Sequence, residues 1–409
     1  MCVHRVRDLP VATSWQSAGP RGVRRREGLP PAAAANTRMT PHTPEYRSRM
    51  RRHAPLRFAR PFVLLACLFA GGAGQAELPL EAPPILLSPV VLPADGRQDV
   101  PAIGYGALAP APVPLLWRVA GEQGALYLLG SFHFLKPDDY PLSEDVAAVI
   151  AGAGEVVFEL APEELHSPTL GLQMMQAGLR ADGSKLDDEL PPQTAQQLRA
   201  WAEANPASLQ AAGGASSLQM FEPWFVSLLV TTSELGRSGL QAHLGMDAQL
   251  ARQAQAAGTP TAGLESAEQQ IGFLDGMGRL EQVQMLQEAL EQVGSGPQSI
   301  EALHATWRAG DADALWNGMG RDMHARFPAL YARINTERND AWLPRLEQML
   351  QQPGDILIIV GALHLLGPDG VVEKLAAKGY QVERICTACA PQQTPPVGAG
   401  SPDSAAGAR

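Results

Sequence analysis

The sequence predicts an α/β domain in which a unit of strand, Gly-x-x-His turn, helix and strand occurs twice, with a large helical insert between the copies. Residues 126–138 and 356–369 each contain a short apolar run, a Gly-x-x-His turn, and a Pro-Asp pair that begins four residues after the histidine. An apolar run of this length bounded by Gly and Pro is typical of a buried strand. Two matching copies predict one mixed or parallel sheet with His133 and His364 at its rim.

The first 76 residues are predicted to lie outside this fold. Residues 1–49 are rich in Arg, Pro and Ala without periodicity, and we interpret them as an upstream extension. Residues 50–76 follow the order of a secretory signal peptide: basic residues, an apolar run too short to span a bilayer as a helix, and small residues ending at Ala76. We therefore expect a periplasmic or secreted protein. The alternative is a lipoprotein anchored at Cys67, because the residues before Cys67 loosely resemble a lipobox.

Removal of the signal peptide leaves a strongly acidic chain. Of the 32 basic residues 13 lie in residues 1–76, as do 3 of the 42 acidic ones, so that 19 basic residues remain against 39 acidic ones. Such a surface repels the phosphates of nucleic acids and anionic headgroups. We expect no nucleic-acid partner and no stable membrane span in the mature chain.

The remaining chain is predicted to be one large domain with a spacer before it and a tail after it. Residues 77–114 contain nine prolines and are interpreted as an extended linker, and residues 390–409 as a disordered tail. Residues 115–389 are numerous enough to bury a substantial core. Cys386 and Cys389 are expected to form a local disulfide in an exported protein, with a redox dithiol as the less favoured reading.

The middle of the domain is predicted to be helical, with one additional strand. Helical spacing is found in a segment that opens at Pro191 and Pro192, and in residues 218–235, 280–293 and 300–307. A strand at 259–264 follows a helix that begins near Met246. Residues 218–235 are strongly apolar, but Glu222 and Glu234 bracket the run, which favours a buried core helix over membrane contact.

Two histidines and a carboxylate are the first candidates for a functional site. Glu159 ends a predicted strand at 155–160, which places an acid at the strand edge beside His133. Two imidazoles and one carboxylate are the ligands of many catalytic metal sites. We expect His133, Glu159 and His364 to hold a divalent ion such as Zn, Mn or Co. The alternatives are structural histidines and a role for Glu159 as a surface cap of a helix near Pro162.

Three further residues complete the candidate set. Glu265 or Glu337 would transfer a proton, and Arg338 would stabilise an oxyanion. The alternatives are helix capping near Ser266 for Glu265, and solvated ion pairs for Glu337 and Arg338. Asp247 is interpreted as a cap of the helix that it begins. Four histidines without a repeated context are interpreted as structural: His166, His243, His304 and His324.

The motifs together resemble the TraB/GumN family, which includes the Tiki proteins. The resemblance covers about residues 115–386, and its motifs are Gly130-Ser-Phe-His133, Phe158-Glu159-Leu160, Glu234-Leu-Gly236, Gly245-Met-Asp247, Gly263-Leu-Glu265, Glu337-Arg-Asn339 and Gly361-Ala-Leu-His364. It implies an α/β domain with two Gly-x-x-His turns, seen in Tiki proteins as a divalent-metal-dependent protease. It also implies a distant similarity to erythromycin esterases and haem-binding ChaN proteins.

The expected function is an exported, divalent-metal-dependent hydrolase that uses a metal-activated water on a peptide or another small extracytoplasmic substrate. Two alternatives remain open. One is a metal-free hydrolase of the erythromycin-esterase type, with a histidine as general base and Glu159 orienting it. The other is a non-catalytic protein that binds haem, a peptide or a glycan. The sequence contains no Gly-x-Ser-x-Gly elbow, phosphate-binding loop or His-Glu-x-x-His motif.

Overall fold

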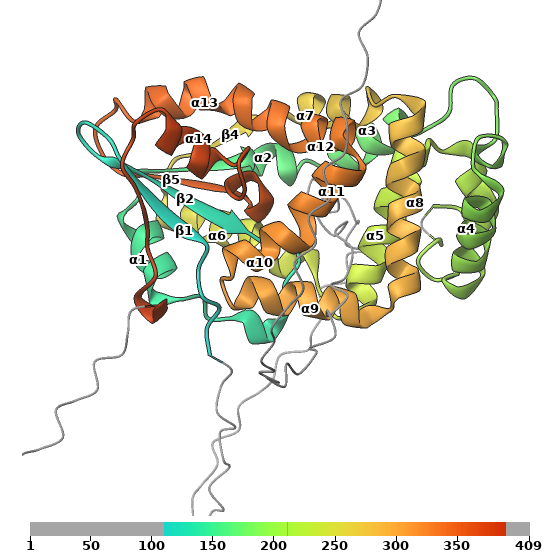
Figure 1. The fold of residues 1–409 in the computed structure, drawn as a ribbon, viewed down its shortest axis with the longest axis horizontal. Helices are drawn as coiled ribbons and strands as arrows, with labels where there is room; N and C mark the ends of the chain where they lie inside the picture. The colour runs from blue at the N-terminus through green and yellow to red at the C-terminus, as the bar shows by residue number, and fades with distance from the viewer. Residues whose placement is uncertain (1–109, 211, 390–409) are drawn as a thin grey trace, which may run out of the picture. The chain divides into compact units, whose positions relative to one another are not determined.

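The computed structural model of the chain describes residues 110–210 and 212–389. The predicted extension, signal peptide and tail, and residues 77–109 of the predicted linker, lie outside the described residues. The domain contains a six-stranded sheet in the order β4-β3-β5-β2-β1-β6 (Figure 1). Its strands are β1 Leu116–Ala120, β2 Ala125–Ser131, β3 Glu155–Leu160, β4 Thr261–Glu265, β5 Ile356–Gly361 and β6 Val382–Arg384.

The two copies of the repeat interleave in this sheet. β5 lies between β2 and β3 and runs parallel to both, with Ser131 of β2 opposite Gly361 of β5. Because the two strands are parallel neighbours, both Gly-x-x-His turns leave the sheet at the same edge. The predicted strand at 259–264 is β4, which pairs in parallel with β3. The α/β fold with a helical insert is therefore confirmed.

One strand that we did not predict makes the sheet mixed. β1 pairs antiparallel with β2 on one side and with β6 on the other. Consequently β6, the second strand of the second copy, lies at the far edge and does not neighbour β5. The last residues of the predicted linker pack at the end of α9 (Pro297–Arg308), since Pro112 and Pro114 are buried and Val113 N–H donates to the Arg308 carbonyl over 2.8 Å.

Helices cover both faces of the sheet and form the insert (Figure 1). Side chains of α1 and α6 pack on one face and those of α13 and α14 on the other. The helices are α1 Glu144–Gly152, α2 Pro162–Leu165, α3 Leu170–Ala177, α4 Pro192–Ala204, α5 Pro223–Arg237, α6 Met246–Ala257, α7 Ala267–Asp275, α8 Arg279–Ser295, α9 Pro297–Arg308, α10 Ala312–Leu315, α11 Arg321–Arg326, α12 Pro328–Tyr331, α13 Glu337–Met349 and α14 Val371–Ala377.

The insert is organised around α5, the helix predicted to be buried. Trp224 and Val230 of α5 are fully buried, and α5 packs along α8. The predicted segment 218–235 divides before Pro223, because proline is favoured in the first turn of a helix and lacks the N–H that would continue the preceding turn. Within the described part of the chain, no helix is both long and apolar enough to cross a membrane.

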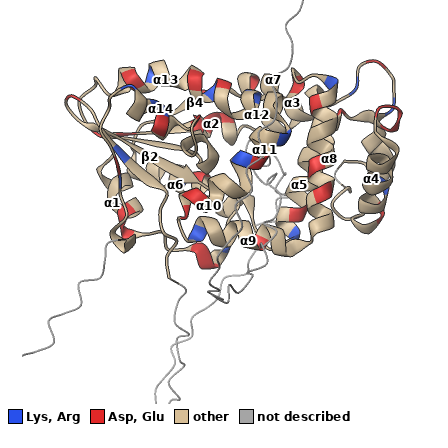
Figure 2. Ribbon diagram, viewed as in Figure 1, with Lys and Arg blue, Asp and Glu red and all other residues tan. Residues whose placement is uncertain are grey.

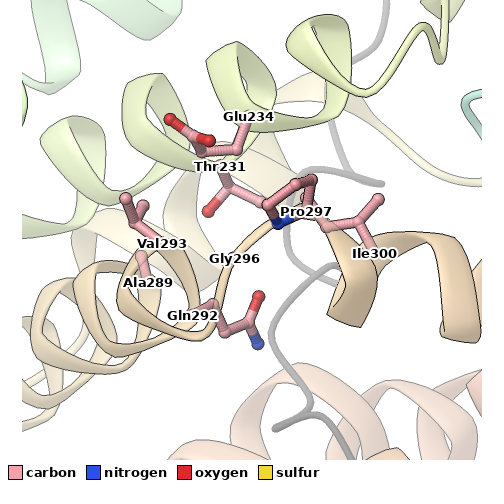
Figure 3. A pocket seen from close by; sticks show the side chains of 8 residues that line it. All are labelled: Thr231, Glu234, Ala289, Gln292, Val293, Gly296, Pro297 and Ile300. Carbon is pink, nitrogen blue, oxygen red and sulfur yellow. The ribbon is translucent and has the colours of Figure 1, made fainter. Parts of the chain in front are cut away.

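Two smaller features complete the fold. A cavity of about 10 Å³, enough for roughly one water molecule, lies between α5, α8 and α9 and is lined in part by Thr231, Glu234 and Ile300 (Figure 3). None of its lining residues belongs to the predicted site. Cys386 and Cys389 are joined by the expected disulfide.

Candidate active site

Five of the six predicted site residues meet at the carboxyl edge of the sheet. His133 and His364 lie in the turns after β2 and β5, Glu159 lies near the end of β3, and Glu265 is the last residue of β4. Arg338 reaches them from α13. All five are buried, with at most 8% of any residue exposed. The topology gathers these side chains because the parallel strands β2, β5, β3 and β4 all end at this edge.

Arg338 is the centre of the hydrogen-bond network. Its Nε and Nη2 donate to the two carboxylate oxygens of Glu265 over 2.8 and 2.7 Å, a bidentate pairing. Nη2 also donates to Glu159 Oε2 over 2.7 Å, and Nη1 donates to His364 Nε2 over 3.0 Å. The guanidinium lies over the ring of Trp342 at 5.1 Å. One buried cation thus connects two carboxylates and one of the two repeat histidines.

The backbone before Arg338 is irregular. Residues Ala332–Thr336 form a π-helical turn directly before α13, and the Ile334 carbonyl in this turn accepts a hydrogen bond from Arg338 Nη1 over 3.4 Å. Single π-helical turns are rare and occur frequently at functional sites.

Glu159 is held as a carboxylate. Its Oε2 faces Arg338, and its Oε1 accepts a hydrogen bond from the backbone N–H of Gly361 over 2.6 Å. Burial alone would raise the pKa of Glu159, but the charge of Arg338, helped by His364 and His133, lowers this pKa to about 2. Glu159 is therefore anionic at any physiological pH.

His364 is fixed as a neutral ring with a defined tautomer. The Asn339 amide nitrogen donates to the carbonyls of His364 and Asp369 over 3.2 and 2.8 Å, so its Oδ1 faces His364 Nδ1 at 2.7 Å. Nδ1 must carry the proton, and Nε2 is left as the acceptor for Arg338. Burial and the charge of Arg338 lower the pKa of His364 to about 3.

His133 has a different partner. Its Nδ1 lies 2.5 Å from Oδ2 of Asp247, whose Oδ1 accepts a hydrogen bond from the Ser131 hydroxyl over 3.0 Å. Burial by itself would lower the pKa of His133, but the Asp247 carboxylate outweighs it and raises this pKa. Nε2 of His133 is buried and has no hydrogen-bond partner among residues 110–210 and 212–389. This nitrogen is therefore available to a ligand or a proton.

The start of α6 brings Asp247 to His133. Met246 N–H donates to the Phe132 carbonyl over 3.1 Å, and a Cβ placed on Gly245 would lie 2.1 Å from the His133 carbonyl oxygen. Only glycine allows this approach of two backbones. The N-cap of α6 is Gly245, without a side-chain cap bond, so our interpretation of Asp247 as a helix cap is wrong.

A small space separates the two histidines and Glu159. Nε2 of His133 and Nε2 of His364 lie 4.0 and 3.9 Å from the same atom, Glu159 Oε1. A Cβ placed on Gly361 would stand 3.2 Å from both Glu159 Oε1 and His133 Nε2 and 3.8 Å from the His364 ring. The glycine at the end of β5 therefore keeps a side chain out of this space.

The buried charges of the site do not balance. Asp247, Glu159 and Glu265 are three carboxylates with at most 8% of each residue exposed, and the Arg338 guanidinium pairs with two of them. With neutral histidines, these four side chains carry a net charge of −2. A buried net charge of this size is costly unless a cation or a proton compensates it.

The structure separates the two acids considered for proton transfer. Glu337 is exposed on α13, beside the buried Arg338, and is not brought to the site. Glu265 is there, but its oxygens accept from Arg338, from Trp342 Nε1 over 2.9 Å and from Gln270 Nε2 over 3.2 Å. With its acceptor positions used in this way, Glu265 is placed to orient Arg338 and is poorly placed to exchange protons. Helix capping near Ser266 is performed by the Ser266–Gln269 capping box.

Sequence reasoning did not assign roles to Asp247 and Asn339 at the histidines. The available signal was their place in the motifs Gly245-Met-Asp247 and Glu337-Arg-Asn339, but nothing local pairs either residue with a particular imidazole. His304, interpreted as structural, is buried with its Nε2 2.8 Å from Asp139 Oδ2, in the segment that follows His133.

Within residues 110–210 and 212–389, no group of three or more His, Cys, Asp or Glu side chains that could hold a metal ion is found as the side chains stand. The two separations from Glu159 Oε1, 4.0 and 3.9 Å, lie at the outer limit for two ligands of one ion, since metal–ligand bonds are about 2 Å long. His364 Nε2 and both oxygens of Glu159 already accept hydrogen bonds, so the features of this centre that an ion could use are the unpartnered His133 Nε2, the space at Gly361 and the excess of carboxylates.

Fold and site together define the class of this protein: an α/β domain with two interleaved Gly-x-x-His units and a buried His-Glu-Arg centre. A family profile described as the TraB/PrgY/gumN family matches residues 115–384. The chain belongs to this family.

Two relatives show how far the similarity extends. "Uncharacterized protein YbaP" of Escherichia coli (strain K12) is 24% identical over 255 residues, which are 61% of this chain and 87% of the relative. An "Uncharacterized protein" of Treponema pallidum (strain Nichols) is 22% identical over 274 residues, which are 63% of this chain and 79% of that protein. No solved structure matches the chain.

Proposed function

We propose that this protein is an exported hydrolase that acts on peptides or other small extracytoplasmic substrates with a divalent ion held by His133, Glu159 and His364. The observation that carries the proposal is the convergence of both Nε2 atoms on Glu159 Oε1, at 4.0 and 3.9 Å, in a buried centre whose three carboxylates and one guanidinium leave an excess of negative charge. A divalent ion would neutralise this charge. When bound, such an ion acts as a Lewis acid and lowers the pKa of water in its coordination shell towards neutrality.

The surrounding side chains have roles that follow from their contacts. Asp247 and Asn339 hold Nδ1 of His133 and His364, which directs each Nε2 towards Glu159, and such outer contacts orient metal-binding histidines in general. The five N–H groups of Arg338 are all engaged with Glu265, Glu159, His364 and the Ile334 carbonyl, so Arg338 would stabilise negative charge on a substrate oxygen through its charge, and Glu265 holds it in place by the bidentate pairing.

The second candidate is a metal-free hydrolase in which His133 is the general base. Two observations favour it. Arg338 already donates to His364 Nε2 and to Glu159, so one cation occupies the centre. The Asp247 carboxylate at His133 Nδ1 leaves Nε2 unpartnered, which is the arrangement of a base oriented by an acid.

Metal analysis of the purified protein tests the proposal. We expect about one Zn, Mn or Co ion per chain and hydrolysis of unstructured peptides that stops with a chelator and returns with the ion. Each of His133→Ala, Glu159→Ala and His364→Ala should lose ion and hydrolysis together while keeping the wild-type circular dichroism. His166→Ala is the matched control, because His166 is an exposed histidine outside the site.

Other outcomes identify the alternatives. Peptide hydrolysis that survives the chelator, and that His133→Ala abolishes, would replace the metal-dependent reading with the metal-free one. A folded protein that retains neither an ion nor turnover, but binds haem, a peptide or a glycan, would support the non-catalytic reading.

A further inference from the structure

We propose that the open groove between α2, α3 and α7 binds an extended peptide segment with neutral or basic side chains, namely a part of the substrate remote from the bond that the hydrolase proposed above would cleave. The groove has a volume of about 550 Å³, within the range of roughly 300–1,000 Å³ typical of ligand sites. Its walls include Glu164, Thr169, Gln173, Gln176, Glu268 and Ile271.

The groove adjoins the buried centre through the loops that leave β3 and β4. Ser266, which lines the groove, directly follows Glu265, whose carboxylate holds Arg338. Glu164 follows β3 and accepts a hydrogen bond from Ala267 N–H over 2.6 Å, which ties the two loops together. Ligands of open α/β sheets bind in the crevice outside the carboxyl ends of the strands, and the groove lies at this edge.

α7 is the wall between the groove and the site. Consecutive helical residues are separated by about 100°, so Ala267, Glu268 and Ile271 share the face that lines the groove. Gln270 and Phe273 lie on a different face: Gln270 Nε2 donates to Glu265 Oε2, and the Phe273 ring lies 5.7 Å from the Arg338 guanidinium. A ligand in the groove is therefore one helix away from Arg338.

The lining chemistry favours a peptide backbone. Gln173 and Gln176 present amides and Thr169 a hydroxyl, groups that donate and accept hydrogen bonds as backbone amides require. The nine lining residues include two carboxylates and no Lys, Arg or His. Phosphorylated, sulfated or acidic ligands would be repelled, and basic side chains would be attracted. Figure 2 shows Asp and Glu on most helices, with fewer Lys and Arg among them.

An apolar row borders the groove on α3, which packs against α7 (Figure 1). Leu172 and Met175 are 49 and 39% exposed and, three residues apart, lie on one side of α3 next to Gln173 and Gln176; Leu179, 41% exposed, follows the end of the helix. An extended peptide has side chains on alternating sides, so one set can contact this row while the backbone meets the amides.

The test measures binding in the full-length His133→Ala protein, so that binding does not depend on turnover. The probes are three dye-labelled ten-residue peptides of Leu, Ser and Gly that carry in addition two Lys, two Gln or two Glu. We expect affinity to fall in this order. Glu268→Lys should abolish the difference between the Lys and Glu peptides, because the new Lys and the remaining Glu164 leave the lining without net charge, and Gln176→Trp should weaken all three by about tenfold by filling the groove. The matched controls, Glu301→Lys on α9 and Gln253→Trp on α6, change equally exposed residues outside the groove.

Kinetics separate this proposal from the hydrolase proposal. In an otherwise wild-type chain, Glu268→Lys and Gln176→Trp should raise KM about tenfold for the Lys peptide and leave kcat unchanged, because they remove binding that is equal in the ground and transition states. Hydrolysis with unchanged KM and unchanged affinity in both variants would overturn the groove and leave the hydrolase standing. If the wild-type chain binds the peptides without turning them over, and both variants weaken this binding, the groove is supported and the hydrolase is overturned.

Discussion

Nδ1 of His133 lies 2.5 Å from a carboxylate oxygen of Asp247, whereas Nδ1 of His364 faces an amide oxygen, that of Asn339, at 2.7 Å. The repeat makes the two histidines equivalent in sequence, but their partners make them different in chemistry. The carboxylate raises the pKa of His133, while burial and Arg338 lower that of His364 to about 3. His133 is therefore the ring that accepts a proton more readily.

We predict that Asp247→Asn lowers ion affinity or activity about 10- to 100-fold, as loss of an outer-shell partner of a metal-binding histidine generally does. The amide keeps the volume and the hydrogen bond from Ser131, so the circular dichroism and melting temperature should change little. The measurement is ion affinity at several pH values beside the pH profile of hydrolysis. An unchanged affinity and profile would mean that Asp247 serves only the packing of α6 against the Gly-x-x-His turn.

We predict that Arg338→Met destabilises the domain by about 3–5 kcal/mol, because it leaves Glu159 and Glu265 buried without their cation. Arg338→Lys should cost less, since an ammonium keeps the charge but loses the bidentate fork. Urea unfolding measures both. Arg237→Met is the control, because Arg237 is exposed, pairs with Glu234 at 3.0 Å and should contribute at most about 1 kcal/mol. Equal effects of Arg338→Met and Arg237→Met would contradict the central role of Arg338.

Glu288 provides a prediction on pH. Burial raises its pKa from 4.5 to about 7, although Arg326 Nη1 lies 2.6 Å from Oε2. The folded state therefore binds this proton more tightly than the unfolded state. The stability that protonation of Glu288 contributes is fully present below pH 4.5, is lost as the pH rises from 4.5 to 7, and is absent above pH 7. The total loss is about 3 kcal/mol. Relative to the wild type, the free energy of unfolding of Glu288→Gln should therefore increase as the pH rises from 4.5 to 7. Glu301→Gln changes an exposed residue, and its free energy of unfolding should vary with pH as that of the wild type does in the same denaturant titrations. If the free energy of unfolding of Glu288→Gln also varied in parallel with the wild type, the raised pKa would not belong to Glu288.

We predict export with cleavage after Ala76, from the order of basic, apolar and small residues in 50–76. N-terminal sequencing of the mature protein measures the cleavage site. A lipid-modified chain that starts at Cys67 would establish the lipoprotein alternative, and an uncleaved cytoplasmic chain would exclude both.

The sequence by itself determined the features that depend on short segments. The apolar runs and their flanking Gly and Pro marked β2, β3, β4 and β5, and the repeated Gly-x-x-His turn marked His133 and His364, because strand and turn signals are local. β1 escaped notice because it is a strand of five residues directly after the Pro-rich segment.

Only the tertiary structure decided which side chains meet. The insertion of β5 between β2 and β3 places Glu159 at Gly361, and α6 and α13 give the equivalent histidines a carboxylate and an amide. The same packing buries Arg338 and leaves its neighbour Glu337 in solvent. These pairings depend on contacts between residues far apart in the chain, and local sequence patterns carry no information about the energies of such contacts. The position of each histidine at a strand end, in contrast, follows from its own few neighbours.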